Sequence, residues 1–134
     1  MKQKILIIED NEQNLYLLTF LLEKYGYAVS AARDGREGIE MAYRIKPDMI
    51  LLDIQLPVMA GYTVAKKLRQ SQDLANTPIV AVTSYAMLGD REKALEAGCT
   101  GYIEKPIDPE TFIEQVEQHF PGKKSVFKIL LLTY

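Results

Sequence analysis

Cysteine, histidine and tryptophan are scarce or absent in this sequence. Its 134 residues include one cysteine, Cys99, one histidine, His119, and no tryptophan. A single cysteine excludes an intramolecular disulfide, which is compatible with a reducing compartment. We expect Cys99 to be a small buried residue near a helix end. Neither Cys99 nor His119 is expected to bind a metal or to take part in catalysis.

The sequence also lacks a strong excess of one charge and a long hydrophobic run. Its 16 basic and 18 acidic side chains give a formal net charge of −2, so it has no basic footprint for nucleic acid. The apolar run near the N-terminus ends at Glu9 and Asp10 and is too short for a secretory signal. No segment reaches the roughly 18–20 continuous apolar residues of a membrane span. We therefore expect a cytoplasmic protein that contacts neither DNA nor a membrane directly.

The residues that are present fit one globular domain followed by a short apolar tail. A chain of 134 residues with 48% hydrophobic side chains can bury a sizeable core. We expect residues 1–121 to form the domain and residues 122–134 (GKKSVFKILLLTY) to form the tail. An exposed apolar tail favours unwanted pairing. We therefore expect it to dock on its own domain or on a second subunit, which would give a homodimer.

Short apolar runs alternate along the chain with longer amphipathic stretches. Strands are expected at residues 4–9, 27–32, 49–52, 78–82 and 101–104. Helices are expected at residues 11–25, between the Asp34-Gly35 turn and Pro47, at 61–70, at about 86–97, and from Asp108 as N-cap through Pro109 to Phe120. The alternation predicts an α/β fold, a doubly wound parallel sheet of five strands with five helices on its two faces.

Polar side chains follow the expected strands at the point where each strand ends. In a doubly wound sheet the carboxyl ends of the strands meet at one edge, where ligands bind. The residues brought to that edge are Glu9 and Asp10, Asp53, Thr83 and Ser84, and Glu104 and Lys105. We expect carboxylates, a hydroxyl group and a lysine to converge there.

This combination of groups suits phosphoryl transfer. Clustered carboxylates repel one another and need a cation, and hard oxygen ligands suit Mg²⁺. Lys105 would supply a charge for a phosphate oxygen and Thr83 a hydroxyl donor. Phosphoryl transfer needs little beyond positioning and charge neutralisation, and one carboxylate can act as the nucleophile.

Taken together, these residues resemble the receiver domains of two-component response regulators. The match covers residues 4–120 and includes the acidic pair Glu9-Asp10, Asp53 in LLDIQLP, Thr83, Tyr102 and Lys105-Pro106. Each motif is weak alone, but the ordered set at four strand ends is specific. The resemblance implies a flavodoxin-like sheet with strand order 2-1-3-4-5.

The resemblance further implies a phosphorylation reaction that depends on Mg²⁺. Asp53 would accept the phosphoryl group, assisted by Lys105 and Thr83. The Mg²⁺ ligands would be Asp10, Asp53 and the backbone carbonyl of Gln55, with Glu9 contributing through water. The peptide bond between Lys105 and Pro106 would be cis.

A signalling role, without an enzymatic one, is the other implication of the resemblance. A sensor histidine kinase or a phosphotransfer protein would donate the phosphoryl group. Thr83 would then move toward it and leave space for Tyr102, and the altered surface would bind a downstream protein effector. No output segment follows residue 121 in this sequence, so we expect either a stand-alone, single-domain regulator or a fragment of a larger regulator or hybrid kinase.

Several positions depart from the usual pattern of the family. Family members often read DxxMPxMDG after the third strand, whereas Leu56 and Ala60 stand here at the Met and Asp positions. Ser84 replaces the commoner Ala or Gly, and it is small enough to leave access to Asp53. Gln55 and Tyr85 fall at positions that tune hydrolysis of the phosphoryl group in this family.

Taken one at a time, the candidate site residues have purely structural interpretations. Asp53 could cap a loop, the Glu9-Asp10 pair could cap the next helix, and Thr83 could be a turn residue. Lys105 could be a solvated surface lysine and Tyr102 a core aromatic residue. The complete set favours the functional interpretation.

Three other functions remain as alternatives. An aspartyl-nucleophile phosphatase typically has a second acid two residues after the first, where this chain has Gln55. A flavodoxin-type carrier needs a loop rich in Ser, Thr or Gly after the first strand, where this chain reads EDNEQN. The third alternative is an interaction module that works without phosphorylation.

Overall fold

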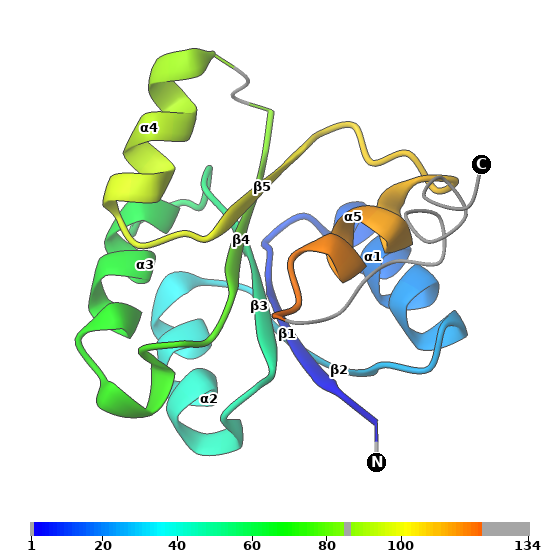
Figure 1. Ribbon diagram of the computed structural model, residues 1–134, viewed down its shortest axis with the longest axis horizontal. Helices are drawn as coiled ribbons and strands as arrows, with labels where there is room; N and C mark the ends of the chain where they lie inside the picture. Colours follow the sequence, from blue (N-terminus) through cyan, green and yellow to red (C-terminus); the bar gives the residue numbers. More distant parts are fainter. Residues whose placement is uncertain (1, 85–86, 122–134) are drawn as a thin grey trace.

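The five strands form one parallel sheet at the centre of the molecule. The computed structural model describes residues 2–84 and 87–121 (Figure 1). The strands are β1 (Lys4–Ile8), β2 (Ala28–Ala32), β3 (Met49–Asp53), β4 (Ile79–Thr83) and β5 (Gly101–Glu104). They pair in parallel in the order β2-β1-β3-β4-β5. The predicted doubly wound sheet and its strand order are therefore confirmed.

The helices form a layer on each side of the sheet (Figure 1). They are α1 (Glu12–Lys24), α2 (Gly35–Ile45), α3 (Gly61–Arg69), α4 (Leu88–Glu96) and α5 (Phe112–Gln118), and the short 3₁₀ helix η1 (Gln72–Leu74) follows α3. Helices α1 and α5 lie on one side, and α2, α3 and α4 lie on the other. Right-handed crossovers between parallel strands produce this arrangement.

Each face of the sheet has its own hydrophobic core. Successive strand side chains point to opposite faces, so Ile5 and Ile7 pack toward α1 and α5, whereas Leu6 and Ile8 pack toward α2 and α3. All four side chains are fully buried. This explains why the first strand lacks a polar alternation: both of its faces are covered. The two layers hold the carboxyl ends of the strands in fixed positions.

Side-chain caps begin the first two helices close to the predicted positions. The Asn11 side chain accepts a hydrogen bond from Asn14 N at 2.9 Å, and the Asp34 side chain accepts one from Glu37 N at 2.8 Å. Such caps satisfy N–H groups that have no partner within the helix. Gly26, with φ of +91°, follows α1 in the left-handed region, where glycine commonly ends a helix.

The start of the last helix differs from the prediction. The helix α5 begins at Phe112 with Thr111 as N-cap, and not at Pro109 with Asp108 as N-cap. The Asp108 carboxylate accepts from Glu110 N at 3.0 Å, while its carbonyl accepts from both Thr111 N and Phe112 N. Asp108 therefore caps a local turn, which uses the donors that a helix N-cap would satisfy. The prediction placed the first helical turn too early.

The structure does not test the prediction for the tail, and it addresses the membrane-span prediction only for the described residues. The apolar tail at residues 122–134, with its expected docking or pairing, lies outside the described residues. Over residues 2–84 and 87–121, none of the helices combines the length and the apolar character that crossing a membrane requires.

The glycine that begins α3 packs directly against the end of β3. A Cβ atom at Gly61 would lie 2.5 Å from the backbone oxygen of Asp53 and 2.6 Å from Ile54 Cα. Backbone atoms cannot rotate away as a side chain can, so Gly61→Ala should displace the segment that carries Asp53. We expect the free energy of unfolding to fall by about 1–3 kcal/mol in urea denaturation.

Gly89→Ala is the matched control, because no atom lies within 4 Å of the Cβ position at the exposed Gly89 in α4. Alanine favours helix more than glycine does, so this variant should be equally stable or up to about 1 kcal/mol more stable. Equal stabilities for Gly61→Ala and the parent protein would contradict the proposed close packing.

Candidate functional site

The candidate site lies at the carboxyl edge of the sheet, where the polar residues were predicted to meet. Glu9 and Asp10 directly follow β1, Asp53 is the last residue of β3, and Thr83 is the last residue of β4. Lys105 follows β5. Because all five strands are parallel and in register, their ends bring these residues to one edge.

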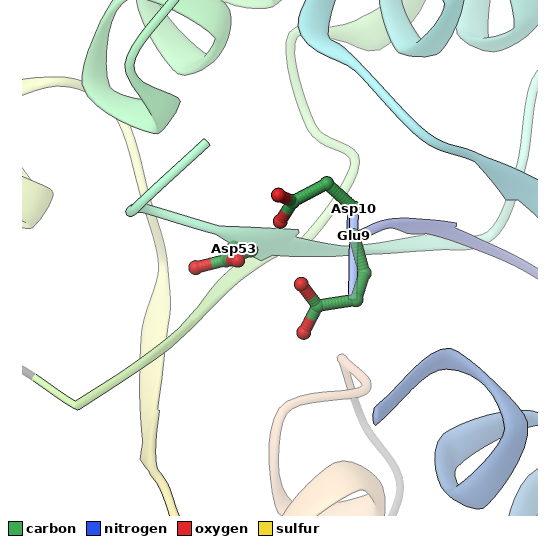
Figure 2. A group of neighbouring side chains, drawn as sticks. All are labelled: Glu9, Asp10 and Asp53. Atoms are coloured by element: carbon green, nitrogen blue, oxygen red, sulfur yellow. The ribbon is translucent and has the colours of Figure 1, made fainter. Parts of the chain in front are cut away.

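Three carboxylates cluster at this edge. One oxygen atom each of Glu9, Asp10 and Asp53 can be chosen such that all three lie within 4.8 Å of one another (Figure 2). Glu9 and Asp53 are only 1% and 4% exposed, whereas Asp10 is exposed. Such a set of hard oxygen ligands, partly withdrawn from solvent and open on one side, fits a divalent cation such as Mg²⁺. The predicted acidic set is therefore assembled.

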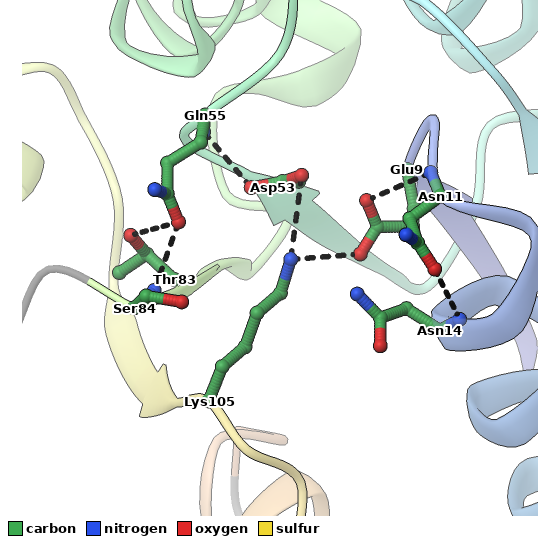
Figure 3. Close-up of polar contacts among 8 residues, drawn as sticks. All are labelled: Glu9, Asn11, Asn14, Asp53, Gln55, Thr83, Ser84 and Lys105. Atoms are coloured by element: carbon green, nitrogen blue, oxygen red, sulfur yellow. Dashed lines mark hydrogen bonds and ion pairs between the residues drawn. The ribbon is translucent and has the colours of Figure 1, made fainter.

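Lys105 lies between two of these carboxylates. Its Nζ is 2.9 Å from Glu9 Oε1 and 3.4 Å from Asp53 Oδ2 (Figure 3). The lysine side chain is 13% exposed, so little solvent screens these contacts. The cluster holds three carboxylates, and Lys105 contacts two of them, Glu9 and Asp53, which leaves the site with an excess of acidic groups. That excess favours a further cation at the exposed side.

The surroundings of Glu9 disfavour the ionised form of its carboxyl group. Burial, and after it the neighbouring Asp53 carboxylate, raise the pKa of Glu9, and Lys105 lowers it; together these effects place the pKa at about 7. Its second oxygen, Oε2, accepts a hydrogen bond from Asn11 N at 3.3 Å. A cation bound at the site would favour the ionised form of Glu9.

The two oxygens of Asp53 have different partners, which fixes the carboxylate in one orientation. The Gln55 N–H donates to Asp53 Oδ1 at 2.8 Å, and Oδ2 faces Lys105 (Figure 3). The Gln55 donor belongs to the turn that follows β3. The backbone after the strand thus orients the carboxylate at its end.

The Gln55 side chain links this turn to the end of β4. Its Oε1 atom accepts from Ser84 N at 3.0 Å and from Thr83 Oγ1 at 3.4 Å (Figure 3). Thr83 is buried, and Gln55 and Ser84 are exposed. The sequence did not predict this link. No pattern in the chain signals a contact between a side chain and a backbone N–H 29 residues away.

Tyr102, the predicted switch residue, lies near the site but outside the carboxylate cluster. It pairs with Ala81 across β4 and β5, and Thr83 follows Ala81 by two residues, so the Tyr102 and Thr83 side chains belong to the same face of the sheet. The guanidinium of Arg91 lies 5.3 Å from the Tyr102 ring centroid, and Arg91 also pairs with Glu104 at 2.7 Å. The half-buried ring is thus held beneath α4.

The Tyr102 hydroxyl is shielded from solvent. Within residues 2–84 and 87–121 it has no hydrogen-bond partner. Burial and nearby carboxylates raise the pKa of Tyr102, so the group remains a protonated donor. The peptide bond between Lys105 and Pro106 is cis, as expected.

Comparison with known proteins matches residues 5–117 to the family model described as the response regulator receiver domain. The polar-differentiation response regulator DivK of Brucella anthropi is 41% identical over 119 residues, covering 89% of this chain and 97% of DivK.

Solved structures agree with the sequence comparison. The chemotaxis protein CheY4 of Vibrio cholerae superimposes with a TM-score of 0.86 at 28% identity, covering 89% of this chain and 99% of CheY4. The receiver domain of sensor histidine kinase PA1611 from Pseudomonas aeruginosa has a TM-score of 0.83 at 33% identity, covering 91% of this chain and 100% of that domain. Its structure contains a magnesium ion in the active site cleft.

The charge balance of the cluster predicts opposite effects for two substitutions in metal-free protein. Asp53→Asn removes one of three clustered carboxylates and should raise the free energy of unfolding by about 1 kcal/mol. Lys105→Met removes the ammonium group that faces Glu9 and Asp53 and should lower it by roughly 2 kcal/mol. Urea denaturation in the presence of EDTA measures both.

Lys67→Met is the control for the lysine substitution, because Lys67 is exposed on α3. Its free energy of unfolding should stay within about 0.5 kcal/mol of the parent value. If Lys105→Met were as stable as Lys67→Met, the ammonium group of Lys105 would not offset the repulsion among the carboxylates.

Proposed function

The chain belongs to the family of response regulator receiver domains, and on that premise we propose that it accepts a phosphoryl group on Asp53. The observation that carries this proposal is the meeting of a buried aspartate, a lysine and an acidic pair at one edge of the sheet. Receiver domains act in two-component signalling as regulators and not as classical enzymes. The donor would be a sensor histidine kinase or a phosphotransfer protein.

In the proposed reaction, a carboxylate oxygen of Asp53 forms a bond to phosphorus while the bond between phosphorus and the donor histidine nitrogen breaks. The Gln55 N–H would hold the carboxylate in its reactive orientation, since it lies 2.8 Å from Asp53 Oδ1. Lys105, 3.4 Å from Asp53 Oδ2, would neutralise charge on the transferred group. Positioning and charge neutralisation are the main requirements of phosphoryl transfer.

We propose Mg²⁺ as the cofactor. The residues that would hold it are Asp10, Asp53 and the backbone carbonyl of Gln55, with Glu9 contributing through water. A bound Mg²⁺ supplies positive charge to the oxygens of the transferred group. The magnesium ion in the related PA1611 receiver domain supports this assignment.

Phosphorylation would alter the surface near α4 through Thr83 and Tyr102. In the proposed change, the Thr83 hydroxyl moves toward the phosphoryl group and Tyr102 takes up the space that it leaves. Their positions on one face of the sheet support this coupling. The surface formed by α4, β5 and α5 would then bind a downstream protein effector in a phosphorylation-dependent way.

The proposal also covers the extent of the domain, its compartment and the role of the tail. We propose that residues 1–121 act as the receiver domain in the cytoplasm, with no direct contact to DNA or a membrane. The tail at residues 122–134 is proposed as a docking or homodimerisation segment. Truncation after Lys124 with no change in solution mass would exclude the homodimer through this tail.

Intact mass after incubation with acetyl phosphate and Mg²⁺ tests the phosphoacceptor. We expect a Mg²⁺-dependent gain of about 80 Da, one phosphoryl unit, that is absent in Asp53→Asn. The control Asp73→Asn removes an exposed carboxylate that pairs with Lys46, away from the cluster, and should be modified like the parent protein. No adduct in the parent protein would leave an interaction module that works without phosphorylation.

Asp10→Asn tests the metal assignment. The substitution removes one of the three clustered carboxylates and keeps the phosphoacceptor. We expect the Mg²⁺ concentration for half-maximal phosphorylation to rise on the order of tenfold, because fewer charged ligands remain. An unchanged Mg²⁺ requirement would remove Asp10 from the ligand set.

A further inference from the structure

A single acceptor atom, the Gln55 side-chain oxygen, takes two donors from the end of β4. Ser84 N donates to Gln55 Oε1 at 3.0 Å, and Thr83 Oγ1 lies 3.4 Å from the same atom. The Gln55 side chain extends from the turn after β3 toward these donors, beside the Asp53 carboxylate (Figure 3). The two donors therefore already point at one common position in the protein without a phosphoryl group.

The same residue also contacts the phosphoacceptor through its backbone. Gln55 N donates to Asp53 Oδ1 at 2.8 Å, so the backbone of Gln55 orients Asp53 while its side chain engages β4. A group attached to Asp53 would extend into the region bordered by Lys105 on one side and by the Gln55 side chain on the other. A group that reached the end of β4 would compete with Gln55 for the donors there.

The two possible acceptors differ in strength. The amide oxygen of glutamine is neutral, whereas a phosphoryl oxygen carries negative charge, and charge-assisted hydrogen bonds are roughly twice as strong as neutral ones. Donors aimed in advance at the position of a developing negative charge stabilise it without reorganisation. The exchange of acceptors would therefore favour the phosphoryl group.

We propose that the amide oxygen of Gln55 stands in for a phosphoryl oxygen in the unmodified protein, and that modification of Asp53 displaces it from Ser84 N and Thr83 Oγ1. Gln55 is then a positioning residue that opposes the modified state. This inference rests on the proposed function of Asp53. It concerns the side chain of Gln55, and not its backbone carbonyl.

The displaced contact has a measurable consequence. In Gln55→Met the side chain keeps its length but loses the acceptor oxygen, so a phosphoryl mimic gains the donors of Ser84 and Thr83 without first breaking their bonds to Gln55. The gain corresponds to about one neutral hydrogen bond, or about a fivefold increase in affinity. Gln55→Ala, which also removes bulk, should show a gain of similar size.

The test uses beryllofluoride, which binds to an aspartate carboxylate as a phosphoryl mimic, at Mg²⁺ concentrations that saturate each variant. Fluorine NMR titrations give the dissociation constant for the parent protein, Gln55→Met and Gln55→Ala. Tighter binding by both variants is expected. If Gln55→Ala binds more tightly and Gln55→Met does not, the side chain acts by its bulk and the proposal is overturned.

The amide resonance of Ser84 gives a second readout that a general structural effect would not produce. In the unliganded state, Gln55→Met should shift the Ser84 amide proton upfield relative to the parent protein, because it loses its acceptor. Beryllofluoride should shift it downfield again in this variant. An unchanged Ser84 resonance in unliganded Gln55→Met would overturn the proposal.

The outcomes also separate this inference from the proposed function. If the parent protein does not bind beryllofluoride, or binds it equally after Asp53→Asn, the phosphoacceptor assignment fails and the inference fails with it. If binding depends on Asp53 but Gln55→Met binds no more tightly than the parent protein, only the inference fails.

Discussion

The candidate site requires three like-charged carboxylates to be held close together against their mutual repulsion. Glu9, Asp10 and Asp53 are brought to within 4.8 Å of one another, and two of them are nearly withdrawn from water. A flexible chain would relieve this repulsion by moving the carboxylates apart. Here the buried strand residues directly before Glu9 and Asp53, residues 5–8 and 49–52, prevent such movement. The stability of the two hydrophobic cores is thus what maintains a site that is unfavourable by itself, and Lys105 offsets only part of the repulsion.

The sequence was sufficient for the parts of the site that depend on chain direction and strand position. Once β1, β3 and β4 were recognised, Glu9, Asp53 and Thr83 had to meet, because parallel strands end at one edge. It was not sufficient for contacts that depend on side-chain direction. Neither the pairing of Lys105 with Glu9 nor the bond from Ser84 N to Gln55 follows a repeating pattern. The late start of α5 was missed because an aspartate can cap a turn as well as a helix.

Comparison with a solved relative also separates features that the whole fold shares from contacts made by individual side chains. CheY4 and this chain share 28% identity yet superimpose over 89% of the chain, so many different side chains can build the same two layers around the sheet. A crowded backbone leaves less freedom in the choice of side chain. At Gly61, even a methyl group would meet the backbone of Asp53 and Ile54. The start of α3 is therefore part of the support of the site, although it contributes no reactive group.

The buried hydroxyl of Tyr102 has a consequence for the sensitivity of the domain. A shielded hydroxyl without a partner costs on the order of 1–3 kcal/mol, and within residues 2–84 and 87–121 none is present. The contact between its ring and Arg91 contributes about 0.5–1 kcal/mol in the opposite direction. The cost of the unpaired hydroxyl therefore offsets the contribution of the ring contact that holds Tyr102 in place. In the switch proposed above, a ring held this weakly would need only a small gain in free energy to move.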